Sequence, residues 1–383
     1  MENETRIDFL YLNEEEMIEA GVLDAGKCVE AVADAMELLS SGDCMMGGKN
    51  RNEHGIAMMF PKESEFDGFP LDVGRDRRFM AMPAYVGGRF HIAGEKWYGS
   101  NSLNKSKGWP RSILMVMLND IDTGAPLALM SANLLSAMRT GAMPGLAAKL
   151  LANEASETLA LIGPGVINRT SLMAILANIG IKRIKIKGSS PSSKNALALK
   201  AFIEETYPQV EKTVLCASDE ECVEGADIVS EAVSVVKGQH PRFKVEWLKK
   251  GSVVISSGSM EFPDEGLASS LRCVVDNVKM YEMYQETWQT FDEATGERIP
   301  TGCAGLHMVN ACDDGLMRKE DIQTLGNILR GLNPGRVSPD ETFFVGVGGM
   351  PILDVAWGHD IYHAAMEKGI GTKLKLWESP FLS

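Results

Sequence analysis

The sequence predicts an α/β protein that combines a Rossmann-type, doubly wound domain with an α+β domain built from both ends of the chain. Three observations support this. A strand pattern leads through two glycines into a helix at 158–179. Strands and helices alternate after residue 157, whereas strand patterns follow one another between residues 56 and 130. The chain also has 383 residues, enough for two domains.

The first 130 residues predict two amphipathic helices followed by a mostly antiparallel sheet. The helices span Asn13–Ala20 and Asp24–Ser40, each with a capping residue at its start. Gly42–Gly55 is rich in glycine and charge and is predicted to be a loop, and the polar Lys62–Arg77 is predicted to be a surface excursion. The predicted strands are Ile56–Phe60, Arg78–Tyr85, Phe90–Tyr98, Arg111–Asn119 and Pro126–Met130.

A long helix, Leu134–Leu151, leads into the alternating region. Short crossover helices between the strands predict a parallel, doubly wound sheet. The tail from Phe343 to Gly369 contains a strand, a glycine pair and a helix, and we expect this tail to return to the first domain. The strands of the sheet are predicted at Thr158–Ile162, Arg183–Lys187, Thr213–Cys216, Ile228–Ser230, Ser252–Ser256 and Cys273–Asp276.

The turn between the first parallel strand and its helix is the organising motif. Gly163 permits a tight turn, Gly165 allows a pyrophosphate to approach the backbone, and the helix N-terminus offers unpaired N–H groups. Asn168 occupies the position of the third glycine of the usual fingerprint. The motif predicts a dinucleotide site at this turn.

The end of the second parallel strand bears on which dinucleotide binds. NAD-binding domains carry an acidic residue there for the ribose 2′-hydroxyl, whereas this sequence has hydroxyls and lysines, including Ser189, Ser190 and Lys194. These groups suit a 2′-phosphate, so NADP(H) is favoured and NAD(H) is possible. The serines could equally cap the next helix, and the two roles are compatible.

Composition excludes several classes of partner. A net charge of −14 argues against nucleic acid and anionic membranes. Because the first eight residues are polar and acidic, we expect no signal peptide, and the sequence has no apolar run of membrane-spanning length. Seven cysteines without a Cys-x-x-Cys motif predict reduced thiols in a cytoplasmic protein, and His359 with His363 lacks a third metal ligand, so no metal is predicted.

Three basic residues are candidates for substrate chemistry. Arg139 lies among small and apolar helix neighbours, and if buried it needs a partner such as a substrate carboxylate. A surface salt bridge is the alternative. Lys96 ends a predicted strand, and from the sequence alone a solvated lysine is the first interpretation. Arg51 lies in a loop otherwise predicted to be exposed.

The order of several short motifs resembles that of the ornithine cyclodeaminase/mu-crystallin family over nearly the whole chain. Single motifs are unspecific, but their order is characteristic. They are Met82-Pro-Ala, Gly94-Glu-Lys96, Asn119-Asp-x-x-Thr-Gly124-Ala-Pro-Leu-Ala, Met138-Arg139-Thr140-Gly-Ala, Leu161-Ile-Gly163-Pro-Gly165, Gly225-Ala-Asp227-Ile-Val, Trp247-Leu-Lys-Lys-Gly251, Val275-Asp276 and Gly348-Gly-Met-Pro-Ile-Leu-Asp354-Val-Ala.

The resemblance implies a substrate-binding and dimerisation domain at 1–135 with 340–383, a Rossmann domain at 136–339, and a homodimer. It implies NAD(P)(H) chemistry on a small amino acid, 2-oxo acid or imine. Arg139 would then grip the substrate carboxylate and Lys96 would lie beside the reacting carbon, as the catalytic residues. Met82, Glu261 and a second carboxylate-binding arginine would also line the substrate site, with Arg51 as the best match for the arginine and Arg75 or Arg78 as alternatives.

The implied cofactor contacts follow the matched motifs. We expect them at Thr140, Gly163, Gly165, Val166, Ile167, Asn168, Ser189, Ser190, Lys194, Ser257, Gly258 and Ser259.

One departure from the family pattern guides the predicted reaction. Cyclodeaminases have an aspartate after the fifth parallel strand, whereas here Met260 stands in that place and Glu261 fits only after a one-residue shift. We therefore favour a ketimine reductase or an opine-type amino acid dehydrogenase. The alternatives are an ornithine or lysine cyclodeaminase with catalytic NAD, and a non-catalytic nucleotide- or ligand-binding accessory subunit of an amine-metabolising system.

Overall fold

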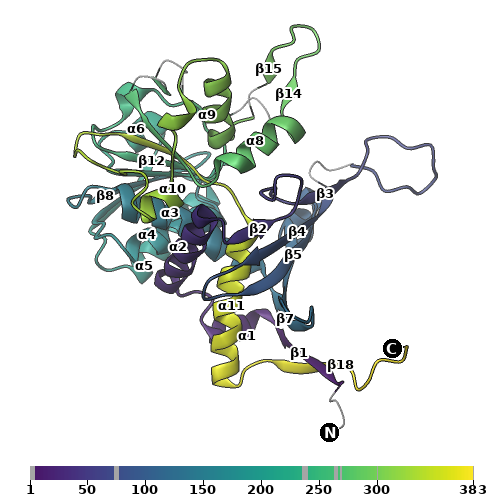
Figure 1. The fold of residues 1–383 in the computed structure, drawn as a ribbon. Coiled ribbons are helices and arrows are strands. Elements are labelled where there is room, and N and C mark those ends of the chain that lie inside the picture. Colours follow the sequence, from purple (N-terminus) through teal and green to yellow (C-terminus); the bar gives the residue numbers. More distant parts are fainter. Residues whose placement is uncertain are drawn as a thin grey trace. The chain divides into compact units, whose positions relative to one another are not determined.

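The computed structural model describes residues 5–72, 77–234, 240–262, 266–267, 270–299 and 301–382. The chain forms two compact units (Figure 1). Unit 1 comprises residues 1–24, 41–139 and 349–383, and unit 2 comprises residues 25–40 and 140–348. Both ends of the chain therefore belong to unit 1. The predicted division at residues 135 and 340 remains a prediction about functional domains.

Unit 1 is built on a mixed sheet in the order β18-β1-β7-β6-β5-β4-β2, with β3 also paired to β4. All its pairs are antiparallel except that of β1 with β7. The helix α11 (Pro351–Lys368) packs against β4, β5 and β6 (Figure 1). The strands are β1 (Ile7–Leu12), β2 (Cys44–Met46), β3 (Ile56–Met59), β4 (Arg78–Val86), β5 (Ile92–Ser100), β6 (Ser112–Asp120), β7 (Pro126–Ser131) and β18 (Thr372–Trp377).

Local sequence accounts for much of unit 1. The helix α1 (Glu14–Ala20) begins at the predicted cap, where the Asn13 side chain accepts a hydrogen bond from the backbone N–H of Glu16. The predicted loop at 42–55 was wrong in one part, because β2 forms there and pairs with β4. This strand has only three residues, too few for the period-2 pattern by which strands are recognised.

Unit 2 contains an eight-stranded sheet in the order β10-β9-β8-β11-β12-β17-β13-β16, in which every pair is parallel. Strands β10, β9, β8, β11 and β12 reproduce the beginning of the Rossmann order, as predicted. The strands are β8 (Thr158–Ile162), β9 (Arg183–Lys187), β10 (Lys212–Cys216), β11 (Ile228–Glu231), β12 (Val253–Ser256), β13 (Arg272–Val275), β16 (Gln323–Thr324) and β17 (Phe343–Gly346).

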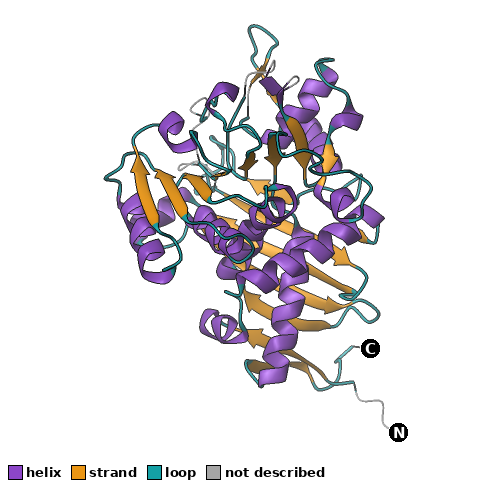
Figure 2. Ribbon diagram, turned by 90° about the vertical axis from the view of Figure 1, so that its left-hand side faces the viewer, coloured by secondary structure: helices purple, strands orange, loops and turns teal. Residues whose placement is uncertain are grey.

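Helices connect and flank these strands (Figure 2). A short hairpin, β14 (Thr290–Phe291) with β15 (Arg298–Ile299), joins two of them. The helices are α2 (Ala25–Ser41), α3 (Asn133–Leu151), α4 (Val166–Leu176), α5 (Lys194–Thr206), α6 (Asp219–Val223), α8 (Val278–Thr287), α9 (Ala304–Asp313) and α10 (Leu325–Leu329), with 3-10 turns at η1 (Ser102–Lys107), η2 (Val245–Trp247) and η3 (Lys319–Asp321).

The tail returns to unit 1 only in part. The helix α11 belongs to unit 1 as predicted, but β17 pairs with β12 and β13 in the parallel sheet, so the expectation for this strand was wrong. All four residues of β17 are buried. An apolar strand without alternation is typical of a sheet covered on both faces, which explains the placement.

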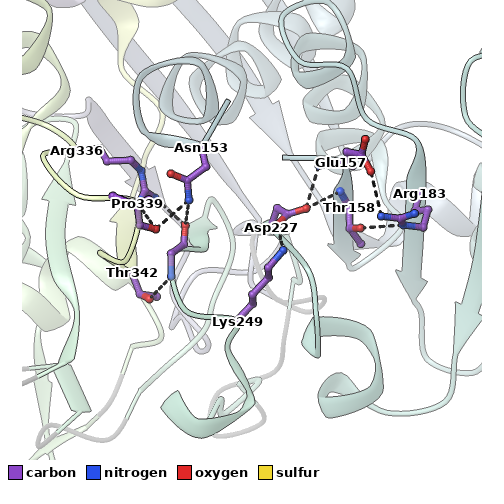
Figure 3. A network of polar contacts seen from close by, with 10 residues as sticks. Asn153, Glu157, Thr158, Arg183, Asp227, Lys249, Arg336, Pro339 and Thr342 are labelled. Atoms are coloured by element: carbon purple, nitrogen blue, oxygen red, sulfur yellow. Dashed lines mark hydrogen bonds and ion pairs between the residues drawn. The ribbon is translucent and has the colours of Figure 1, made fainter. Parts of the chain in front are cut away.

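The amino ends of the parallel strands are held by a polar network (Figure 3). Asp227 accepts hydrogen bonds from the backbone N–H groups of Glu157 and Thr158, each at 2.9 Å, and pairs with Lys249. The Arg336 guanidinium donates to the Gly251 carbonyl at 2.9 Å. These contacts tie the loops at this edge together. Ligands of open parallel sheets bind at the opposite, carboxyl edge.

None of the helices in the described part of the chain combines the length and apolarity needed to cross a bilayer. None of the seven cysteines, all in described positions, forms a disulfide.

Candidate functional site

A buried charged cluster lies inside unit 1. Lys96 is in the middle of β5, where the strand alternation turns it inward while its neighbour Trp97 is 42% exposed. The Lys96 side chain is only 3% exposed, so the interpretation as a solvated strand-end lysine was wrong. The strand continues to Ser100, two residues beyond its predicted end, and α11 packs against it and places Asp354 next to Lys96, which shields the lysine from solvent.

Asp354 joins the two predicted cations. Its Oδ2 lies 2.9 Å from Lys96 Nζ and its Oδ1 lies 3.0 Å from Arg139 Nε, and the carboxylate is completely buried. The Ser136 hydroxyl lies 3.1 Å from Arg139 Nη2 and 3.4 Å from Lys96 Nζ. Two cations share one carboxylate here, so the cluster carries an excess positive charge in a dry environment, which is costly unless an anion joins it.

The environment tunes the proton affinity of the cluster. Burial, helped by the nearby Arg139 charge, lowers the pKa of Lys96 to about 8, although Asp354 opposes this. Burial tends to raise the pKa of Asp354, but the charges of Arg139 and Lys96 outweigh it and the pKa is lowered. Asp354 therefore stays ionised, and Lys96 can exchange a proton near neutral pH.

Arg139 offers a hydrogen-bond donor to a ligand. It is 3% exposed, and its buried Nη1 has no hydrogen-bond partner among the described residues. A Cβ atom added to Gly349 would lie 2.9 Å from Nη1, so glycine leaves room beside the guanidinium. A planar carboxylate could satisfy this donor and neutralise the excess charge, which fits the predicted role of Arg139.

His54 is also close to the cluster. Its Nδ1 makes a very short hydrogen bond to the carbonyl oxygen of Gly349. Burial first, and then the positive charge of Lys96, lowers the pKa of His54 to about 3, so the imidazole is neutral at physiological pH. The ring therefore adds a neutral polar group beside the two cations.

The other predicted substrate residues occupy different places. Met82 is fully buried and pairs directly with Lys96 across β4 and β5. Arg51 is exposed on a turn with a φ of 58°. Arg78 begins β4, with its Nη2 3.4 Å from the Tyr98 hydroxyl, and Arg75 lies outside the described residues. Hence Met82, Lys96 and Arg139 lie together, and the substrate contact of Arg51 stays a prediction.

The glycine turn in unit 2 has the geometry of a phosphate-binding turn. Gly163 has a φ of 87°, and a Cβ atom there would lie 2.9 Å from the Ala232 carbonyl oxygen. Gly165 caps α4 in an extended conformation without a side-chain cap, and a Cβ on it would meet nothing within 4 Å. Space is therefore open beside Gly165, and the start of α4, which no side chain caps, fits a dinucleotide pyrophosphate.

Asn168 supports this turn from inside. Its side chain is fully buried, and Nδ2 lies 2.7 Å from the Ile162 carbonyl, 2.9 Å from that of Gly163 and 3.1 Å from that of Ser230. The Ser230 hydroxyl donates to Asn168 Oδ1 at 2.7 Å. Because the amide is fully engaged, Asn168 can touch a nucleotide only through its backbone. The predicted neighbours Val166, 65% exposed, and Ile167 form the first turn of α4.

The loop after β12 is held by a buried carboxylate that the sequence analysis did not single out. Glu231 Oε1 accepts from the backbone N–H groups of Val233 at 2.6 Å and Ser259 at 3.1 Å, while Oε2 accepts from the Ser256 hydroxyl at 2.7 Å. Burial raises the pKa of Glu231. The carboxylate thereby fixes the half-buried 257–259 segment that was predicted to touch the cofactor.

Glu261 follows this loop and lines a cavity of about 330 Å³ together with His307 and Asn310. Its Oε2 lies 3.6 Å from Arg242 Nε. Met260, at the position of the cyclodeaminase aspartate, is fully buried.

The predicted 2′-phosphate groups lie at the end of β9 and the start of α5. Ser189 and Lys194 are exposed and Ser190 is partly exposed, and the first turn of α5 contains no acidic residue. Lys187 Nζ donates to the Gly188 carbonyl at 2.7 Å and lies 3.9 Å from Asp219. Thr140 begins the second segment of unit 2, directly after Arg139.

In the charged cluster, Asp354 and His54 are residues that the sequence analysis missed, as it missed Glu231, whose carboxylate holds the loop after β12. Asp354 was detectable, because an acidic residue between Leu353 and Val355 on an apolar helix needs a partner, as Arg139 does. It also lies in the first turn of α11, where the helix dipole favours a negative charge. His54 gives no such signal, since the residues just before it, Arg51, Asn52 and Glu53, are all polar.

The histidine pair on α11 has a local explanation. The rings of His359 and His363 are 4.4 Å apart, and His359 Nδ1 lies 3.0 Å from Asp360. No group of three or more candidate metal ligands occurs among the residues that the structure describes.

Comparisons with known proteins agree with this architecture. The model of the ornithine cyclodeaminase/mu-crystallin family matches residues 25–369. The chain is 26% identical to N-((2S)-2-amino-2-carboxyethyl)-L-glutamate dehydrogenase of Staphylococcus aureus, over 97% of this chain and 99% of the relative. It is 29% identical to a Delta(1)-pyrroline-2-carboxylate reductase of Bacillus cereus, over 68% and 74% of the two chains.

Among solved structures, an archaeal alanine dehydrogenase dimer with bound NAD superposes with a TM-score of 0.75 at 25% identity, covering 97% of this chain and 100% of that one. A parallel Rossmann-like sheet joined to a mixed sheet from both termini is therefore shared with this enzyme.

Proposed function

Because the chain belongs to the ornithine cyclodeaminase/mu-crystallin family, we propose that it is an NAD(P)(H)-dependent oxidoreductase acting on the C–N bond of a small amino acid or its imine. The reaction is ketimine reduction, or its reverse in an opine-type amino acid dehydrogenase. The observation that carries this proposal is the buried cluster in which Lys96 and Arg139 share Asp354. The dehydrogenase and reductase names of the two relatives support it.

Arg139 binds the carboxylate next to the reacting carbon. Its Nη1 donor and the excess positive charge of the cluster provide the attraction, and Asp354 and Ser136 keep the guanidinium in one orientation. Fixing the carboxylate in this way holds the adjacent C=N bond in one position, which lowers the entropic part of the barrier.

Lys96 handles the proton. In the reductive direction, Nζ of protonated Lys96 gives a proton to the nitrogen of the C=N bond, and in the oxidative direction neutral Nζ removes one. A pKa of about 8 suits both directions, because either form is accessible near neutral pH. The bound nicotinamide supplies or accepts the hydride.

The cofactor binds at the Gly163–Gly165 turn, whose open α4 N-terminus fits a pyrophosphate. We favour NADP(H), because Ser189, Ser190 and Lys194 lie at the start of α5, whose first turn carries no acidic residue that would repel a 2′-phosphate. NAD(H) remains the alternative, and the archaeal alanine dehydrogenase structure was solved with NAD.

We propose a homodimer formed through unit 1. The sheet face opposite Lys96 exposes a group of large apolar side chains, which a second copy could cover. They are Trp97 (42% exposed), Ile113 (50%), Met115 (43%) and Met117 (37%). The archaeal alanine dehydrogenase structure contains a dimer.

A screen of amine and 2-oxo acid pairs, followed by the nucleotide absorbance, tests the function. We expect NADPH consumption with at least one pair, and consumption slowed by about 10²–10³-fold with Arg139→Met. Ammonia release from ornithine or lysine without net nucleotide turnover would instead establish a cyclodeaminase. Tight nucleotide binding without turnover on cyclic or acyclic ketimines would establish a binding protein.

A further inference from the structure

A row of side chains continues from Lys96 along the same face of the unit 1 sheet. Strand alternation puts Lys96, Tyr98 and Ser100 of β5 on one face. The register with β4 pairs Tyr98 with Met80 and Ser100 with Arg78, so Arg78 shares this face. On this face, the Arg78–Ser100 pair is therefore the second cross-strand pair after the Lys96–Met82 pair.

Tyr98 lies between two cations. Lys96 Nζ and Arg78 Cζ are each 5.8 Å from the centre of its ring, and Arg78 Nη2 lies 3.4 Å from its hydroxyl. The ring packs with Met80 and Met82 in an apolar cluster. Apolar side chains therefore separate the two cations. Because each cation lies 5.8 Å from the same ring centre, the distance from Lys96 Nζ to Arg78 Cζ is at most twice that value.

Arg111 adds a second guanidinium at the far end of the row. It directly precedes β6, where Ser112 pairs with Ser100, and its carbonyl accepts a hydrogen bond from the Asn101 backbone at 2.9 Å. Burial, followed by the charge of Arg78, lowers the pKa of Arg111. The two guanidinium groups thus influence each other, and an anion bound between them would gain from both.

We propose that Arg78, Arg111 and the Tyr98 hydroxyl form a second anion-binding subsite, so that the substrate is an amino acid or imine with a second acidic group. This inference rests on the proposed function of the Arg139 cluster. One carboxylate binds Arg139, the carbon chain crosses the apolar surface at Tyr98, and the second acid binds Arg78 and Arg111. A molecule the size of a dicarboxylic amino acid, or of two joined amino acids, can span this arrangement.

The charge of the binding partner follows from the same contacts. Guanidinium groups and a hydroxyl donate hydrogen bonds and recognise carboxylates, whereas they repel an ammonium group. A diamino acid such as ornithine would place its second amino group against two cations. The subsite therefore favours acidic over basic side chains.

Binding of simple acids tests the subsite without requiring turnover. We expect glutarate to bind the full-length enzyme about tenfold or more tightly than butyrate, measured by calorimetry. Arg78→Met and Arg111→Met should each remove this preference and leave butyrate binding unchanged. Equal affinity of the two acids, or a preference that survives both substitutions, would overturn the inference.

Two variants control for structural damage. Arg78→Lys keeps a positive charge and should restore part of the preference for glutarate. Arg77→Met removes the neighbouring arginine, whose guanidinium instead lies over Phe60, and should change nothing. If Arg77→Met removes the preference as fully as Arg78→Met does, local unfolding explains both and the inference is overturned.

The same experiments separate this inference from the proposed function. Reduction of monocarboxylic and dicarboxylic imines with equal kcat/KM would overturn the subsite and leave the oxidoreductase intact. A glutarate preference that depends on Arg78, in a protein that reduces no imine, would support the subsite and overturn the oxidoreductase.

Discussion

The glycine turn of unit 2 and the charged cluster of unit 1 are built in opposite ways. The turn consists of consecutive residues, Thr158 to Leu176, whose backbone supplies the binding groups. The cluster draws Lys96, Arg139 and Asp354 from one strand and two helices, and its side chains supply the groups. A backbone site depends on glycine, whereas a side-chain site depends on mutual charge compensation.

A substitution in one site should therefore impair that site and leave the binding function of the other unchanged. The largest loss of activity is expected from a substitution in the cluster. Arg139→Met removes the carboxylate grip, so kcat/KM for the substrate should fall by about 10²–10³-fold. The dissociation constant of the nucleotide, measured by fluorescence titration, should stay within about twofold, because the turn is untouched. Arg318→Met is the matched control, since the Arg318 side chain is 76% exposed. Equal loss of substrate and nucleotide binding in Arg139→Met would contradict the assignment.

Gly163→Ala should produce the reverse pattern. The added methyl group would lie 2.9 Å from the Ala232 carbonyl oxygen, at a φ of 87° that alanine rarely adopts. A strain of about 1–3 kcal/mol predicts a loss of nucleotide affinity of about 10–100-fold. Gly225→Ala, also at positive φ but with nothing within 4 Å of its Cβ, controls for backbone strain alone. Unchanged nucleotide affinity in Gly163→Ala would show that the turn does not bind it.

The pH dependence of the rate sharpens the comparison, because only the cluster contains a group that titrates near neutrality. Since protonated Lys96 is the donor in reduction, kcat/KM should fall about tenfold per pH unit above the Lys96 pKa of about 8. In the oxidative direction it should rise through the same value. Lys96→Arg keeps the charge but moves the titration out of range, so the dependence should disappear. A dependence that persists in Lys96→Arg would assign it to another group.

The smallest expected effect concerns stability in acid. The pKa of His54 is lowered from 6.5 to about 3 by burial, so the unfolded chain binds more protons between these values. Stability should therefore decrease as the pH falls below about 6.5, by on the order of 2 kcal/mol down to about pH 5. His54→Asn should reduce this decrease in urea unfolding, whereas His91→Asn, at an exposed position, should not. An identical decrease in His54→Asn and the unchanged protein would contradict the burial of a neutral imidazole.

The sequence analysis succeeded where a pattern is local and periodic. The strands β8 and β9 match their predicted limits, and α1 begins at its predicted capping residue Asn13. It failed for β2, which is too short to show a period, and for the pairing of β17, because a buried strand pattern does not reveal which sheet it joins.

The site was predicted in the same uneven way. Arg139 stood out because its neighbours are apolar, and the same reasoning would have identified Asp354. Lys96 was interpreted as a solvated strand-end residue because the predicted strand ended at Tyr98, two residues before the end of β5. Arg51 was preferred to Arg78 from motif order, and only the register of β4 with β5 shows that Arg78 shares a face with Lys96.

By itself, the sequence determined the parallel sheet, the glycine turn and the need of Arg139 for a partner, because periodicity, glycine spacing and a charge among apolar residues act over a few neighbouring positions. Only the tertiary structure decided that Asp354 lies 2.9 Å from Lys96 and 3.0 Å from Arg139. Contacts between residues hundreds of positions apart depend on how helices and sheets pack, and local patterns carry no information about that packing.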